Sequence, residues 1–71
     1  MTKKLLPKTR ALKYWRLAEE CGEVTQCLSK INRFGLNNKR EGQKLTNKER
    51  LLEELSDLKH AIKEVEKDVK D

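Results

Sequence analysis

Four carboxylates stand in two pairs that have the same spacing in the two halves of the sequence. Glu20 and Glu23 form the first pair, and Glu54 and Asp57 form the second. Residues three apart are neighbours on a helix surface, so each pair would present two carboxylates side by side. Converging carboxylates repel each other, and a hard divalent cation such as Mg²⁺ or Mn²⁺ relieves that repulsion. His60 stands alone, without the cysteine–histidine spacing of a zinc site, so the pattern favours an all-oxygen magnesium site.

Acidic residues on helices more often form a solvated surface than a metal site, and a single pair is a weak signal. Two pairs at matching positions are a stronger one, because at about 100° per residue each pair lies beside the apolar stripe of its own helix. The other helical acids serve as a comparison. Glu53, Glu64 and Glu66 point outward or lie near lysines, and we interpret them as surface residues.

The elements that must position these pairs are two helices. Apolar residues recur at three- and four-residue steps in both halves of the chain, which predicts helices over 8–32 and 47–70. Thr46 followed by Glu49 predicts a capping box at the start of the second helix. The segment 33–45 has the composition of a loop, and no strand is expected. The two stripes are Tyr14, Leu17, Cys21, Val24, Leu28 and Ile31, then Leu51, Leu55, Leu58, Ile62, Val65 and Val69.

The two predicted helices also correspond to each other at one constant offset, by which Glu20 matches Glu54 and Glu23 matches Asp57. We interpret this repeat as an antiparallel helical hairpin with approximate two-fold symmetry. A two-fold axis between antiparallel helices keeps both acidic pairs on one side, at the margin of the apolar core. The expected fold class is therefore all-α, with a two-helix antiparallel hairpin as the unit.

The chain has 71 residues, which allows one domain of a size that is marginally stable alone. Cys21 and Cys27 stand roughly 9 Å apart along one predicted helix, too far for a disulfide. Both are therefore expected as thiols in a reducing compartment. No signal peptide and no apolar run of membrane-spanning length is evident, so the expected location is cytoplasmic.

The order of the acidic motifs resembles a known family. The segments Leu-Ala-Glu-Glu-Cys-Gly-Glu-Val at 17–24 and Glu-Glu-Leu-Ser-Asp-Leu at 53–58 are similar to the E-E-x-x-E … E-x-x-D motif. That motif belongs to the MazG-like all-α nucleoside triphosphate pyrophosphohydrolases, and the small phage and mobile-element members look closest. The resemblance covers about residues 14–66, including Arg33-Phe34-Gly35 after the first helix. It implies that 1–71 is a single MazG-like helical domain.

The resemblance also implies an activity and a site. The family binds Mg²⁺ through its acids and hydrolyses a nucleoside or deoxynucleoside triphosphate by water attack at the α-phosphorus, giving a monophosphate and pyrophosphate. By motif position, the implied metal-binding and catalytic residues are Glu20, Glu23, Glu54 and Asp57. Glu19 also matches the motif, but its angle points away from the stripe, so a supporting role beside the ligands is expected.

Basic and aromatic residues near the end of the first predicted helix are candidate substrate contacts. Lys30 and Arg33 are candidates for binding phosphate oxygens, and Phe34 is a candidate surface on which a base stacks. The alternative for Lys30 and Arg33 is a solvated basic surface, which is the favoured interpretation of Lys39 and Arg40.

A two-helix hairpin leaves one apolar side open, and the family cores have more helices than two. Two hairpins in a four-helix bundle would cover that side, so a homodimer or a dimer of dimers is expected. The net charge of +5 also suits an anionic partner. Three interpretations without catalysis stay open: a basic hairpin that binds nucleic acid, a bare interaction module, and a chain that keeps the family fold but has lost the activity. Against the first, neither helix has a one-sided basic face with base-reading residues.

Overall fold

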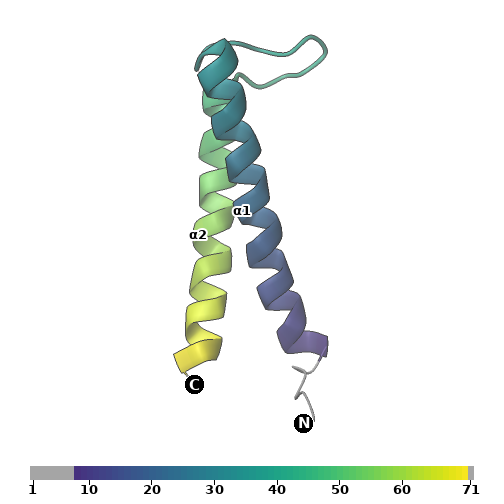
Figure 1. Cartoon of the computed structure of the whole chain (residues 1–71), viewed down its shortest axis with the longest axis vertical. Coiled ribbons are helices and arrows are strands. Elements are labelled where there is room, and N and C mark those ends of the chain that lie inside the picture. The colour runs from purple at the N-terminus through teal and green to yellow at the C-terminus, as the bar shows by residue number, and fades with distance from the viewer. Residues whose placement is uncertain (1–7, 71) are drawn as a thin grey trace.

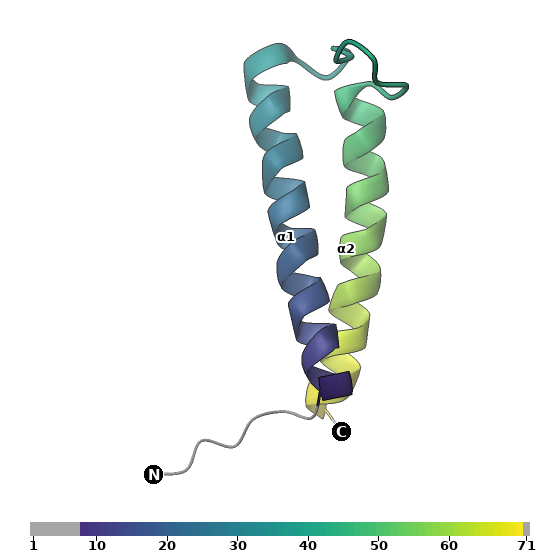
Figure 2. The same cartoon turned by 90° about the vertical axis from the view of Figure 1, so that its right-hand side faces the viewer.

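A computed structural model describes residues 8–70 of the chain. These residues form two α-helices, α1 (Lys8–Phe34) and α2 (Asn47–Lys70), and contain no strand. The helices run antiparallel and side by side, with the connecting loop at one end of the hairpin (Figure 1 and Figure 2). The predicted all-helical hairpin is therefore confirmed for the described residues.

The first helix ends at a glycine in the left-handed conformation. Gly35 has a φ of 89°, and its N–H donates a hydrogen bond to the carbonyl of Ile31 at 2.8 Å. This single bond is the αL cap, and glycine adopts it without the steric cost that a Cβ would bring. As a result α1 continues to Phe34, two residues beyond the predicted end at 32.

The second helix begins with the predicted capping box. The N–H of Thr46 donates to Oε1 of Glu49 at 3.0 Å, and the N–H of Glu49 donates to Oγ1 of Thr46 at 3.2 Å. The bonds from Thr46 lower the pKa of Glu49, because they favour its charged form. These two bonds satisfy donors that would otherwise be unpaired, and α2 starts at Asn47.

The loop between the helices is tied to the first turn of α2. The N–H of Asn47 donates to the carbonyl of Asn38, and the N–H of Lys48 donates to the carbonyl of Leu36, each at 2.9 Å. The side-chain amide of Asn47 donates to the carbonyl of Gly35, also at 2.9 Å. These bonds hold the loop against the end of the hairpin, close to the last turn of α1.

The contact between the helices is a narrow seam. Val24 and Cys27 of α1 and Ala61 of α2 are its buried residues, and Ala61 is only 1% exposed. The small side chain of Ala61 lets the two helices approach each other closely. Half-buried residues continue the seam along both helices, among them Tyr14, Leu17, Glu20, Ile31, Leu51, Glu54, Leu58, Val65 and Asp68.

The seam contains most of the two apolar stripes predicted from the sequence but is shifted around each helix. Cys21 and Leu28 were placed in the first stripe, yet both are exposed, while Cys27 is buried instead. Ile62 of the second stripe is also exposed. The physical reason is the helix surface that packs: Cys27 lies on the side of α1 that faces α2, so Cys21 and Leu28 on its other flank stay exposed.

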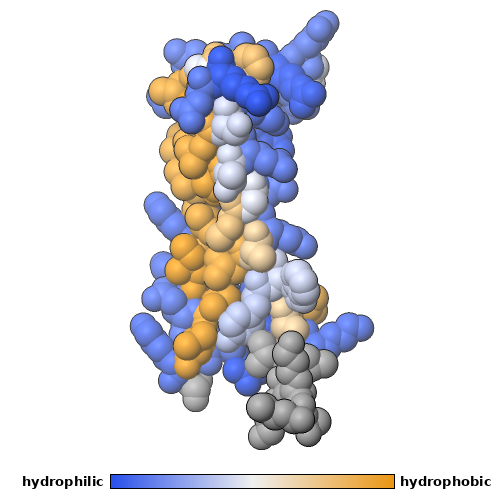
Figure 3. Space-filling model, in the orientation of Figure 1, coloured by the Kyte–Doolittle hydropathy of each residue, from blue (hydrophilic) through white to orange (hydrophobic). Residues whose placement is uncertain are grey.

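The rotation leaves an apolar band along the hairpin, on the face seen in Figure 3. At about 100° per residue, Leu28 of α1 and Ile62 and Val69 of α2 fall on the same side of the seam, away from the acidic pairs. No helix within residues 8–70 is long and apolar enough to cross a membrane. The large apolar side chains exposed in the described chain are Leu12, Trp15, Leu28, Phe34, Leu36, Leu52, Ile62 and Val69.

The end of the hairpin opposite the loop is held by a polar network. Arg10 donates from Nε to Oδ1 of Asp68 at 2.9 Å and from Nη2 to Oδ2 at 2.7 Å. The hydroxyl of Tyr14 donates to the same Oδ2 at 2.7 Å. The Arg10 guanidinium, and after it Tyr14, lower the pKa of Asp68. A weaker pair between Lys13 and Glu64, 3.8 Å apart, lies one turn further along.

Candidate metal centre

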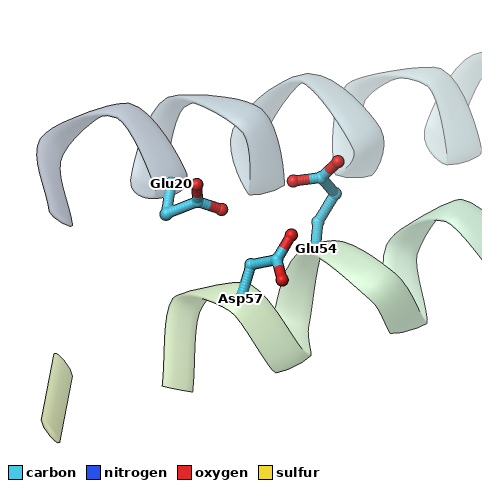
Figure 4. A group of neighbouring side chains, drawn as sticks. All are labelled: Glu20, Glu54 and Asp57. Atoms are coloured by element: carbon cyan, nitrogen blue, oxygen red, sulfur yellow. The ribbon is translucent and has the colours of Figure 1, made fainter. Parts of the chain in front are cut away.

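Three carboxylates from the two helices come together at the edge of the seam. They belong to Glu20 of α1 and to Glu54 and Asp57 of α2 (Figure 4). One oxygen of each lies within 4.8 Å of an oxygen of the other two. Glu20 and Glu54 are half-buried, and Asp57 is exposed. We refer to these three residues as the acid cluster.

The register of the hairpin explains this convergence. The ion pair between Arg10 and Asp68 fixes which turns of the two helices face each other. The step from Arg10 forward to Glu20 covers nearly the same rise as the step from Asp68 back to Asp57. Glu54 joins them because residues three apart share a helix surface. The acid cluster therefore follows from the position of the acids along each helix together with the antiparallel pairing.

The carboxylate of Glu20 has an oxygen that is both removed from solvent and unpaired. Its Oε2 atom is buried and accepts no hydrogen bond from residues 8–70. Leaving a buried polar atom without a partner costs roughly 1–3 kcal/mol, and more when the group is charged. A cation between the three carboxylates would provide the missing partner.

The surroundings of Glu54 disfavour a bare negative charge. Burial raises the pKa of Glu54, and the charges of Glu23 and Glu20 raise it further. Arg50, one turn earlier on α2, acts in the opposite direction. Conditions that raise the pKa of a carboxyl group in an anionic cluster also favour a divalent cation, because the ion neutralises the cluster.

Glu23 lies beside the acid cluster but does not join it. It is exposed, and its oxygens are not among those that converge, although its charge contributes to the raised pKa of Glu54. Glu19 is also exposed, and within residues 8–70 it forms no ion pair. The structure thus brings together three of the four ligands predicted from the sequence and leaves the fourth at their margin.

The donors of this cluster are all oxygens. His60 is exposed and lines a different surface hollow with Lys59 and Lys63. Both cysteines are free, and burial raises the pKa of the Cys27 thiol, which keeps that sulfur protonated. Carboxylate oxygens without nitrogen or sulfur suit hard cations, so the residues of the acid cluster fit Mg²⁺ or Mn²⁺.

The predicted substrate contacts lie together at the loop end of the hairpin. Lys30, Arg33 and Phe34 line a cavity of about 500 Å³, which the loop residues Lys39 and Arg40 also line. Phe34 is 61% exposed, so its ring is accessible. No residue of the acid cluster lines this cavity, which begins further along the hairpin towards the loop.

A smaller cavity lies between the larger one and the acid cluster, and the sequence did not predict it. It has a volume of about 120 Å³, and its lining includes Lys30, Arg40, Arg50 and Cys27. Arg50 could have been found from its place four residues before Glu54, which puts it on the same helix surface. Arg40 could not, because its position depends on how the loop folds.

No protein-family model, curated protein or solved structure matches the chain. The resemblance to the MazG-like family stays a prediction, carried by the motifs at 17–24 and 53–58. The features that bear on function are therefore the acid cluster and the basic cavities beside it.

Proposed function

We propose that this chain is a Mg²⁺-dependent hydrolase of the MazG-like kind, which converts a nucleoside or deoxynucleoside triphosphate to a monophosphate and pyrophosphate. The observation that carries the proposal is the convergence of Glu20, Glu54 and Asp57, together with the buried, unpaired oxygen on Glu20. The order of the two acidic motifs supports it independently, because the same residues match the motif of that family.

In this proposal the three carboxylates of the acid cluster hold the cation, and Glu23 is placed to serve as a further ligand. A bound Mg²⁺ neutralises phosphate charge and activates water. A carboxylate of the cluster that does not hold the ion would accept the proton of the attacking water. Lys30 and Arg33 are the proposed phosphate contacts at the loop end, where both line the larger cavity.

We further propose that two copies of the hairpin form a four-helix bundle through the apolar band. The hairpin alone buries only Val24, Cys27 and Ala61 among its described apolar residues, which is a small core for an independent domain. Leu28 and Ile62 lie exposed on the band, and contiguous exposed apolar surface of this kind marks an interaction site. Pairing two bands would bury it, leaving the acidic edges outward.

The experiment that tests the activity uses the purified full chain with a panel of ribonucleoside and deoxyribonucleoside triphosphates. Each reaction is run with Mg²⁺ and with EDTA, and both pyrophosphate and monophosphate are measured. We expect equal amounts of the two products with Mg²⁺ and none with EDTA. Glu54→Gln should lower kcat by about 100-fold or more, since a metal-held water and neutralised phosphates supply several kcal/mol.

Glu53→Gln is the matched control, because Glu53 adjoins Glu54 but is exposed and outside the acid cluster. This variant should keep the activity of the unchanged chain. A helical, folded protein that releases no pyrophosphate from any of these nucleotides with Mg²⁺ or Mn²⁺ contradicts the proposed activity.

A second candidate is a basic hairpin that binds nucleic acid without catalysis, and the charge at the loop end favours it. Lys30, Arg33, Lys39 and Arg40 line one cavity there, against the single acid Glu41. Oligonucleotide binding that weakens steeply with salt, together with an absence of turnover, supports this candidate over the enzyme.

A further inference from the structure

The charged residues that line the smaller cavity at the loop end are all positive. Lys30 projects from α1, Arg40 from the loop and Arg50 from α2, so three separate elements contribute. We refer to these three residues as the basic pocket. None of its lining residues is an acid. Like charges that face one small volume repel one another. An anion bound between them removes that repulsion.

The cations of the basic pocket form no ion pair within residues 8–70, although Arg50 lies near enough to Glu54 to lower its pKa. The ion pairs formed by residues 8–70 join Arg10 to Asp68, Lys13 to Glu64 and Lys70 to Glu66. All three pairs lie at the opposite end of the hairpin from the loop. Lys30, Arg40 and Arg50 therefore have donors that no ion pair engages, and these can bind a ligand.

Side chains rather than the end of a helix would supply the donors. The pocket adjoins the first turn of α2, but the backbone N–H groups there are already engaged. Those of Asn47, Lys48 and Arg50 donate to backbone carbonyls, and that of Glu49 donates to the Thr46 hydroxyl. An anion in the pocket would be bound by the two guanidinium groups, whose paired N–H donors match phosphate oxygens, and by the ammonium of Lys30.

The pocket and the acid cluster lie in line along one edge of the hairpin. Arg50 precedes Glu54 by one turn on α2, which is a rise of about 6 Å. On α1, Cys27 lies in the wall of the pocket, and Glu20 lies two turns before it. From the acid cluster towards the loop, the charge along this edge changes from negative to positive. The change takes place over a distance that a short chain of phosphates can span.

We propose that the basic pocket binds the terminal phosphates of the substrate, so that pyrophosphate leaves from the loop end while the α-phosphate lies at the acid cluster. This assignment rests on the proposed function. In the reaction, the water oxygen forms a bond to the α-phosphorus, and the bond from that phosphorus to the oxygen bridging to the β-phosphorus breaks. The bridging oxygen keeps the electron pair and leaves with pyrophosphate, and the proton of the water passes to a carboxylate and then to solvent.

The direction of the substrate follows from charge. Two phosphates carry most of the negative charge of the triphosphate, and they are placed against three cations that can offset the charge that develops on the leaving group. The nucleoside then extends from the acid cluster away from the loop. Phe34, at the far side of the basic cavities, is in that case not the surface on which the base stacks.

The test measures binding of inorganic pyrophosphate to the full chain by calorimetry, with and without Mg²⁺. Arg40→Gln and Arg50→Gln should each weaken pyrophosphate binding about tenfold, as expected for the loss of one charge-assisted contact. Lys67→Gln, which removes a positive charge from an exposed site outside the pocket, should leave it unchanged. Binding of a nucleoside monophosphate should be the same in all four proteins, because a monophosphate does not reach the pocket.

Helicity and melting temperature are recorded for each variant. If Arg50→Gln is poorly folded, Arg50→Lys is used as the conservative replacement. It should recover part of the affinity for pyrophosphate that Arg50→Gln loses. If Arg40→Gln and Arg50→Gln still turn over the substrate and bind pyrophosphate as tightly as the unchanged chain, this inference is wrong and the proposed activity stands. If the two variants weaken the binding of monophosphate and of pyrophosphate equally, the proposed direction of the substrate is wrong. A pocket that binds oligonucleotides but no pyrophosphate, in a chain without turnover, overturns both the inference and the proposed activity.

Discussion

Glu20 on α1 and Glu54 on α2 hold carboxylate oxygens within 4.8 Å of each other, although both side chains are half-buried. Two negative charges this close in a partly desolvated place oppose folding of the hairpin where the helices pack. The same closeness favours a cation or a proton between them. Protonation and metal binding should therefore each stabilise the folded hairpin.

Lowering the pH should stabilise the metal-free hairpin through Glu54. Its pKa is raised above the ordinary value of 4.5, so the folded state binds this proton more tightly than the unfolded chain does. The contribution of Glu54 is therefore fully present below about pH 4.5 and is lost as pH rises through its raised pKa. We expect the melting temperature in EDTA to fall over this window. Glu54→Gln should remove that fall, and an equal fall in the variant contradicts the assignment.

Adding Mg²⁺ at neutral pH should stabilise the hairpin through the acid cluster. A ligand at 100 times its dissociation constant adds about 2.7 kcal/mol to the free energy of unfolding. For a domain of this size the melting temperature should rise by roughly 10 °C or more. Glu20→Gln removes a ligand and should abolish most of the rise, whereas Glu53→Gln should retain it. Equal rises in both variants would show that the ion acts through general screening.

The contact between Arg10 and Asp68 should hold the ends of the helices together. Asp68 accepts bonds from Arg10 and from Tyr14, so Asp68→Asn should lower the melting temperature more than Tyr14→Phe, which removes one bond only. The pKa of Asp68 is lowered, so this contribution is present above its ordinary value of 3.8 and is lost as pH falls through the lowered pKa.

Melting curves of both variants at neutral pH and near pH 3 provide the measurement for this contact. Because Arg10 is half exposed, the effect should shrink at high salt. A difference between Asp68→Asn and the unchanged chain that is the same at both pH values contradicts the role of the charge.

Local patterns predicted the helices and the metal-ligand candidates, because each depends on residues within one helix. Three- and four-residue spacing marks a helix, and the capping box of Thr46 and Glu49 marks where α2 begins. The matching position of Glu20 and Glu54 in the two halves of the chain then placed both acids on one edge. The convergence of both with Asp57 needed only the antiparallel pairing in addition.

What the sequence did not predict depends on contacts between distant segments. The centre of an apolar stripe does not say which residues the helix contact buries: Ala61 is the most buried residue of α2, although it lies outside the predicted stripe. The bonds from Arg10 to Asp68 join residues at opposite ends of the chain, and no local signal accompanies them. Arg40 reaches the basic pocket only because the loop folds back onto α2, a path set by backbone bonds from Asn47 and Lys48.

The apolar band should be the surface on which two copies of the hairpin meet. Ile62→Glu places a charge in the middle of the band and should convert a dimer into a monomer, with a lower melting temperature. Light scattering after size-exclusion chromatography gives the mass, which should be about twice the 8.4 kDa of one chain before the substitution. Lys63→Glu is the control, because it places the same carboxylate at the exposed residue next in sequence and makes an even larger change in net charge. A monomeric, stable unchanged chain contradicts the bundle.

Phe34 separates the two directions in which a nucleotide could lie along the acidic edge. With the terminal phosphates in the basic pocket, Phe34→Ala should change KM for triphosphates by less than about twofold, because the base is at the other end. If the base stacks on Phe34, the loss of that contact should raise KM about tenfold or more and weaken monophosphate binding equally. Leu36→Ala is the matched control, since Leu36 is also an exposed apolar residue at the loop end but lines neither cavity. A large effect of Phe34→Ala alone therefore reverses the proposed direction while leaving the acid cluster as the place of hydrolysis.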